Sequence, residues 1–107
     1  MEKGVPKLVR DNDPTVMRAK GVRFMEHEAS GEELRGYLFR KPLEEAGEVV
    51  EAMNSRAKTI EEIGDLLDTV DAILEFDGID MEKVEASRLA KRTSRGCFSK
   101  GKIVETY

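Results

Sequence analysis

Cysteine, histidine and long apolar runs are scarce in this chain, and each scarcity excludes certain classes of protein. The single cysteine, Cys97, cannot form a disulfide within the chain, which is typical of proteins in a reducing cytoplasm. No apolar run approaches the length that spans a bilayer, and the N-terminus lacks the apolar core of a secretory signal. We therefore expect a cytoplasmic protein that works without a membrane.

Histidine and positive charge are also in short supply. His27, the only histidine, cannot provide the two Glu-x-x-His motifs of a di-iron carboxylate bundle. The 18 Lys and Arg against 22 Asp and Glu give a formal net charge of −4, which argues against a nucleic-acid polymer as partner. Acidic residues crowd the middle of the chain, whereas basic residues gather towards both ends. These basic ends either form solvated surface or receive a polyphosphate.

The chain is short and lean in apolar residues. Its 107 residues predict one domain, residues 1–107, and its hydrophobic fraction of 39% leaves little material for a core. A core of this size can be completed by a partner subunit, so we expect a homodimer or homotetramer.

Caps and breaks divide the chain into helices. Asp13-Pro14 predicts the start of a short helix that Gly21 ends. The capping-box spacing of 30–33 predicts a longer helix, and Pro42 predicts a kink or break in it near residues 40–41.

The second half of the chain predicts further helices. Apolar residues recur at helical spacing from Pro42 to about residue 57, and Thr59 is the expected cap of the next helix, with Glu62 completing its capping box. Asp77-Gly78 ends that helix, and Asp80 caps another that runs to about residue 93. The prediction is an all-α fold resembling a four-helix bundle, with residues 103–104 either a short terminal strand or coil.

Two pairs of carboxylates stand at matching positions on two of these helices. Glu45 and Glu48 are three residues apart, and so are Glu62 and Asp65, so each pair shares one face of its helix. Residues 49–61 are enough to end one helix, turn and begin an antiparallel one. Four carboxylates would then face one spot, and oxygen ligands of this kind suit hard cations such as Mg²⁺.

A solvated acidic face is the alternative interpretation. Any amphipathic helix needs a polar side, and Glu62 has another role as the partner of Thr59 in a capping box. Two observations favour a metal site. Neither acidic face carries the Lys or Arg four residues further on that relieves a run of carboxylates, and Asp65 lies within a helix, where aspartate is a poor helix former.

The paired motif, with the sequence Gly-Asp-Leu-Leu at 64–67, resembles the signature of the all-α NTP pyrophosphohydrolases. Two further boxes are similar to those of the MazG-like and phosphoribosyl-ATP pyrophosphohydrolase-like branch. Residues 7–11, Lys-Leu-Val-Arg-Asp, resemble its N-terminal KLVRDKIP box, and residues 95–98, Arg-Gly-Cys-Phe, resemble its RGGF box. Asn12-Asp13 replace Lys-Ile in the first box and Cys97 replaces a glycine in the second, so the substrate stays open.

The resemblance implies an activity and a set of roles. The protein would hydrolyse a nucleoside triphosphate or related nucleotide to the monophosphate and pyrophosphate, with Mg²⁺, or Mn²⁺ in its place, as cofactor. The implied metal ligands are Glu45, Glu48, Glu62 and Asp65. Glu44 or Glu48 would be the general base, and the implied phosphate-binding residues are Lys7, Arg10, Lys91 and Arg95. The competing hypothesis is a non-catalytic helical interaction or regulatory protein with the same fold.

Overall fold

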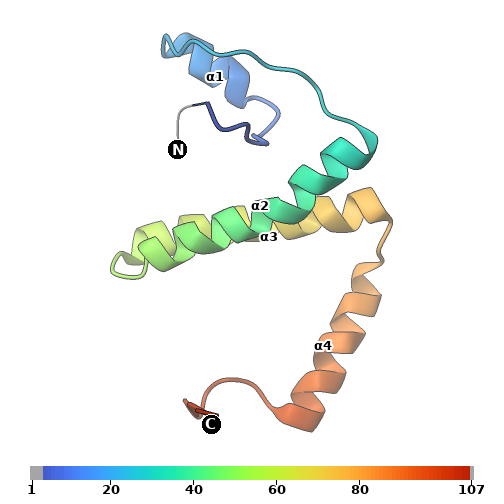
Figure 1. Ribbon diagram of the computed structural model, residues 1–107. Helices are drawn as coiled ribbons and strands as arrows, with labels where there is room; N and C mark the ends of the chain where they lie inside the picture. Colours follow the sequence, from blue (N-terminus) through green and yellow to red (C-terminus); the bar gives the residue numbers. More distant parts are fainter. Residues whose placement is uncertain (1–3, 107) are drawn as a thin grey trace.

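The protein is described by a computed structural model that covers residues 4–106. This part of the chain contains four helices and no strand, which confirms the all-α prediction (Figure 1). The helices are α1 (Asp13–Ala19), α2 (Gly31–Glu51), α3 (Arg56–Asp77) and α4 (Met81–Arg95). Residues 103–104 are coil, so the alternative of a terminal strand is not realised there.

Helix α2 continues through Pro42 instead of breaking there. It runs without interruption for 21 residues, with the proline inside it. Proline costs a helix interior about 3 kcal/mol, because it removes one hydrogen bond and crowds the preceding turn. Helix α2 packs against α3, and Leu38, one turn before Pro42, is one of the most buried side chains of the described chain. We infer that this tertiary packing offsets the cost of the proline.

Helix α3 begins four residues earlier than its sequence predicts. Ser55 is the N-cap, and its hydroxyl oxygen accepts a hydrogen bond from the backbone N–H of Lys58 at 3.2 Å. The hydroxyl of Thr59, the expected cap, instead donates to the backbone carbonyls of Ala52 and Ser55, each at 2.8 Å. Glu62 is therefore in the body of the helix and not in a capping box, so its carboxylate is available for another role.

The end of α3 follows the prediction. Gly78 has φ of 63° and ψ of 35°, the left-handed conformation that glycine adopts most readily at a helix C-terminus. Asp80 then caps α4, its side chain accepting a hydrogen bond from the backbone N–H of Glu82 at 3.0 Å.

Helices α2 and α3 form an antiparallel pair, and in the described chain they are the only two helices with an extensive contact (Figure 1). Ala52 and Leu38, with relative exposures of 7% and 9%, are the buried apolar residues of this pair. At the end of the pair opposite the connecting turn, the guanidinium of Arg35 donates from Nε and Nη2 to the two carboxylate oxygens of Asp77, at 3.1 and 2.9 Å. The same guanidinium lies 4.4 Å from the centre of the Phe39 ring.

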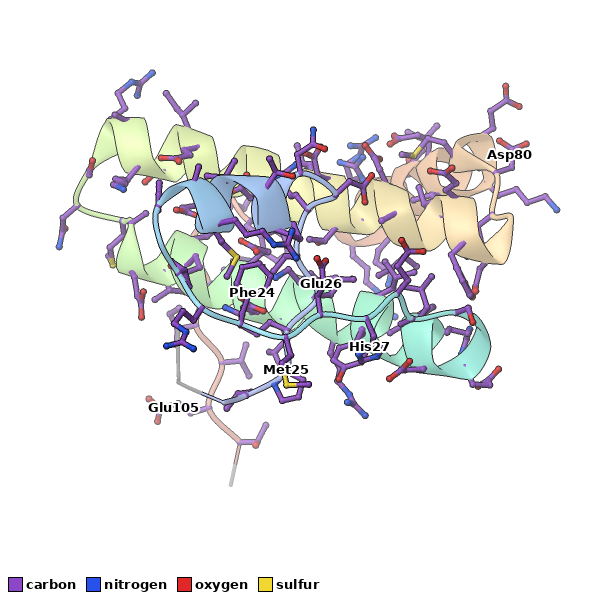
Figure 2. All side chains as sticks on the ribbon, turned by 90° about the horizontal axis from the view of Figure 1, so that it is seen from above. Phe24, Met25, Glu26, His27, Asp80 and Glu105 are labelled. Carbon is purple, nitrogen blue, oxygen red and sulfur yellow. The ribbon has the colours of Figure 1, made fainter. Side chains whose placement is uncertain are left out.

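The remaining elements extend away from this pair. Helix α4 diverges from it after Gly78, and the segment between α1 and α2, which carries Phe24 and His27, passes over α2 (Figures 1 and 2). This segment is joined to α1 by Arg18, which pairs with Glu26 and lies 4.8 Å from the centre of the Phe24 ring.

A single chain leaves much of its expected core uncovered. Its accessible surface is 9657 Å², against about 6,000 Å² for a compact monomer of 12.0 kDa. Its radius of gyration is 17.5 Å, against about 13 Å for a compact domain of this length. Leu43, Val50 and Met53, which belong to the apolar residues at helical spacing between Pro42 and residue 57, have relative exposures of 79%, 66% and 74%. The predicted helical period is present, but within residues 4–106 no other helix covers these side chains.

No helix in the described range 4–106 combines the length and the apolar character needed to cross a membrane.

Candidate metal centre

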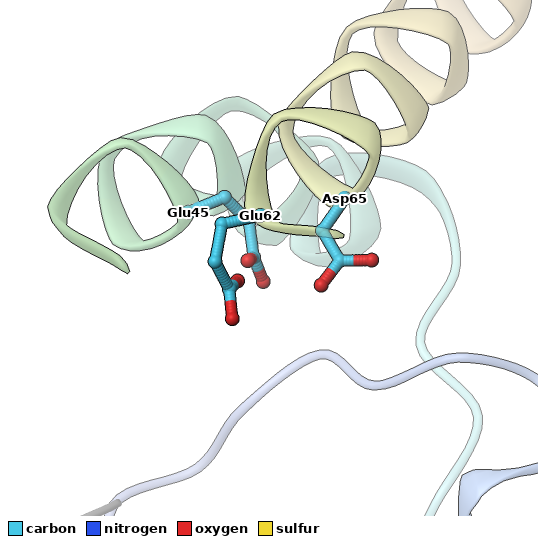
Figure 3. A group of neighbouring side chains, drawn as sticks. All are labelled: Glu45, Glu62 and Asp65. Carbon is cyan, nitrogen blue, oxygen red and sulfur yellow. The ribbon is translucent and has the colours of Figure 1, made fainter. Parts of the chain in front are cut away.

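Three carboxylates converge on one side of the α2–α3 pair. Glu45 projects from α2, and Glu62 and Asp65 project from α3 towards the same side (Figure 3). One carboxylate oxygen from each residue lies within 4.8 Å of the other two, and all three side chains are partly buried. The antiparallel pairing of α2 and α3 brings these residues together across 17 to 20 positions of sequence.

The proximity of these carboxylates affects their proton affinity. The pKa of Glu62 is raised above its ordinary value, first by loss of hydration and then by the negative charge of Asp65. The charges of Glu48, Glu61 and Glu45 act in the same direction. Negative charge is thus concentrated around Glu62, and a cation placed there would relieve it.

Glu48, the fourth predicted ligand, lies beside this group but is not part of it. Its side chain is exposed, and together with Glu62 it lines an open groove of about 360 Å³ near the turn between α2 and α3. Its charge contributes to the raised pKa of Glu62, so the two carboxylates are close enough to interact. The structure therefore brings three of the four predicted ligands together and places the fourth at the edge.

Glu44, one of the two predicted bases, is held by two lysines. It forms ion pairs with Lys7 from the N-terminal segment and with Lys41, whose Nζ lies 3.2 Å from Glu44 Oε2. Loss of hydration acts to raise the pKa of Glu44, but the hydrogen bonds from Lys7 and Lys41 outweigh it and the pKa is lowered. A carboxylate with a lowered pKa and two bound ammonium groups is a poor proton acceptor.

Lys41 is a site residue that the sequence argument missed. Its Nζ also lies 3.7 Å from Glu45 Oε1, so it joins Glu44 to the carboxylate group. No Lys or Arg follows the paired carboxylates by four residues, but Lys41 precedes Glu45 by four. On a helix, a neighbour one turn earlier is as close as one a turn later.

Arg10, predicted to bind phosphate, binds carboxylates in this structure. Its Nη2 lies 2.8 Å from Asp65 Oδ1 and its Nη1 lies 2.8 Å from Asp68 Oδ2. These hydrogen bonds, that of Asp68 first and that of Asp65 second, raise the pKa of Arg10. Asp68 thus contacts the guanidinium on the surface and is not one of the three converging carboxylates.

Lys91 and Arg95, the other predicted phosphate ligands, are not brought to this site within one chain. Both lie on α4, which diverges from the α2–α3 pair (Figure 1), and both side chains are exposed. Among the described residues, no ion pair joins either of them to the acidic group. Arg95 is the last residue of α4, and Gly96 follows it with φ of 78°, a conformation that favours glycine.

The donor set fits a hard divalent cation. All three converging groups offer carboxylate oxygen, the ligand that Mg²⁺ and Mn²⁺ prefer, and neither histidine nor cysteine is among them. At the Mg²⁺ bond lengths of about 2.0–2.1 Å, adjacent ligand oxygens are about 3 Å apart and opposite ones about 4.2 Å apart, so the three oxygens would move closer together to bind one ion. With only three protein ligands, further positions would remain for water or substrate oxygen.

Comparison with family models gives one match that covers more than half of the chain. The model of the MazG nucleotide pyrophosphohydrolase domain matches residues 35–97, a range that begins in α2 and ends just after α4. All three converging carboxylates lie within it. Comparison with curated proteins and with solved structures gives no match.

Proposed function

The chain belongs to the MazG nucleotide pyrophosphohydrolase domain family, and from this premise we propose that it hydrolyses a nucleoside triphosphate or related nucleotide to the monophosphate and pyrophosphate. The observation that carries the proposal is the convergence of Glu45, Glu62 and Asp65 from two helices. Water would attack the α-phosphorus, the bond from that phosphorus to the α–β bridging oxygen would break, and pyrophosphate would leave.

Mg²⁺ bound by Glu45, Glu62 and Asp65 would supply neutralisation of phosphate charge and activation of water, which account for much of phosphoryl-transfer catalysis. The chain's own cations would meet the remaining charge of the substrate. Lys7 and Arg10, which are paired with Glu44 and Asp65, would bind phosphate oxygens.

Glu48 is the better candidate for the general base. Glu44 is occupied by Lys7 and Lys41, and its lowered pKa makes it a weaker base. Glu48 is exposed on the groove that Glu62 also lines, where water has free access to its carboxylate. As the general base, Glu48 would accept the proton of the attacking water.

We also propose that the working unit is a homodimer or homotetramer. The surface in excess of a compact monomer is about 3,700 Å² per chain, more than the roughly 1,000–2,500 Å² that each subunit of an obligate dimer buries. The exposed apolar side chains of Leu43, Val50 and Met53 would be buried in such an interface. A second copy could also bring its α4, with Lys91 and Arg95, to the acidic group, which one chain does not do.

The activity is tested by pyrophosphate release from a panel of ordinary and damaged nucleoside triphosphates and phosphoribosyl-ATP, with and without Mg²⁺. We expect release that requires Mg²⁺ and is lost in Glu45→Gln and Asp65→Asn. In water labelled with ¹⁸O, the label should enter the monophosphate and not the pyrophosphate, because attack is at the α-phosphorus. No turnover across the panel would favour the non-catalytic interaction protein.

A further inference from the structure

The two terminal nitrogens of the Arg10 guanidinium bind two different carboxylates, of which only one belongs to the three converging carboxylates. Asp65, one of the three converging carboxylates, accepts from Nη2, and Asp68, which lies one turn further along α3, accepts from Nη1. The N-terminal segment that carries Arg10 passes on the side to which the three carboxylates point (Figure 3). Arg10 thus lies beside the three carboxylates and donates one hydrogen bond to one of them, Asp65.

The same segment is fastened to the other helix by a second cation. Lys7 pairs with Glu44 of α2, three residues before Arg10 reaches α3. The segment therefore crosses from one helix to the other with a positive charge at each end. Lys7 pairs with Glu44, next to Glu45 in the sequence, and Arg10 pairs with Asp65. These two positive charges partly neutralise the negative charge of the acidic group.

A guanidinium and a divalent cation make competing demands on Asp65. Each is stabilised by the negative charge of this carboxylate, and each repels the other when both are next to it. Asp65 is partly buried, and its Oδ1 is 2.8 Å from Arg10 Nη2, so a cation bound by Asp65 would stand close to the guanidinium. Asp68 is exposed and outside the group, so it can hold Arg10 regardless of what Asp65 binds.

We propose that Arg10 is an internal counter-ion that competes with the divalent cation for Asp65. When the cation binds, the hydrogen bond from Arg10 to Asp65 is given up, while the bond to Asp68 keeps the guanidinium at the edge of the site. There it is free to bind a phosphate oxygen, which is the role that the N-terminal box predicts for it. This inference rests on the metal site of the proposed function.

The competition is measured by calorimetric titration of the full chain with Mn²⁺ and with Mg²⁺. Arg10→Gln should bind either ion about threefold to tenfold more tightly than wild type, because one exposed ion pair no longer has to break and one positive charge is gone. Arg35→Gln is the matched control. It removes an equal charge and a guanidinium contact to α3, but at Asp77, about 18 Å along the helix from Asp65. Its affinity should equal that of wild type.

A second measurement needs no variant. In NMR spectra of wild type, added Mg²⁺ should shift the Arg10 Nε–Hε resonance and leave that of Arg35 in place. Equal or weaker cation binding by Arg10→Gln, or an Arg10 resonance indifferent to Mg²⁺, would overturn the competition, and weaker binding would indicate that Arg10 instead positions Asp65. Failure of wild type to bind either ion would overturn the metal site itself, so the two failures are distinguishable.

Discussion

Glu45→Gln should raise the stability of the metal-free protein and remove most of its stabilisation by metal. In wild type, the carboxylate of Glu45 lies within 4.8 Å of two others, and each such pair repels by about 0.9 kcal/mol even at the dielectric constant of water. The Nζ of Lys41 lies 3.7 Å from Glu45 Oε1, and this attraction is about 1.1 kcal/mol at the same dielectric constant. The net effect of removing the charge is a gain of about 0.6 kcal/mol, or about 2–5 °C in melting temperature for a chain of this size.

The effect of metal has the opposite sign. At a cation concentration about 100 times the dissociation constant of wild type, bound metal stabilises the fold by about 2.7 kcal/mol. Loss of a direct ligand should weaken binding by about 100-fold, the upper end of what loss of an outer partner costs. The variant would then gain only about 0.4 kcal/mol at the same concentration. The order of melting temperatures should therefore invert when metal is added.

The assay is thermal unfolding followed by circular dichroism, with EDTA and with increasing Mg²⁺ or Mn²⁺. Glu75→Gln is the control, because Glu75 is an exposed glutamate of α3 outside the carboxylate group. It should match wild type in both conditions. An equal metal-dependent gain in Glu45→Gln, or no gain in wild type, would refute the reasoning.

Three further predictions concern the fold. Leu38→Ala should lower the free energy of unfolding by about 2–3 kcal/mol in urea titrations, since Leu38 is buried between α2 and α3 but its surroundings can partly collapse; a loss below about 0.5 kcal/mol would contradict this packing. Ser55→Ala should cost about 1 kcal/mol by the same titration, because it removes the cap of α3, and an unchanged midpoint would argue against that cap. Arg35 lowers the pKa of Asp77 by hydrogen bonding to it, so their pair stabilises the fold above the ordinary Asp pKa of 3.8 and is lost as pH falls through the lowered value. Arg35→Gln should accordingly lower the urea midpoint more at about pH 7 than at acid pH, where Asp77 becomes protonated, and a loss that stays the same as the pH is lowered would exclude the ion pair as the cause.

Most helix ends and the convergence of three of the four predicted carboxylates could be predicted from the sequence for local reasons. The left-handed Gly78 and the cap at Asp80 depend on neighbouring residues, so both could be read from the chain. The i,i+3 spacing placed Glu62 and Asp65 on one face of α3, and the length of the connection placed Glu45 opposite them.

The errors arose where tertiary contacts override local preference. Packing against α3 carries α2 through Pro42, which local rules treat as a break. Ser55 and Thr59 are both good caps, and the sequence does not show that Thr59 uses its hydroxyl on backbone carbonyls. The guanidinium of Arg10 reaches α3 across more than 50 residues, a contact that no local pattern encodes.

The most direct test of the account is the anomalous scattering of Mn²⁺ in crystals of the protein. We expect a peak within ligand distance of one carboxylate oxygen from each of Glu45, Glu62 and Asp65, lost in crystals of Glu45→Gln. A Mn²⁺ peak elsewhere, with these three carboxylates turned to solvent, would contradict the metal site and the activity proposed from it.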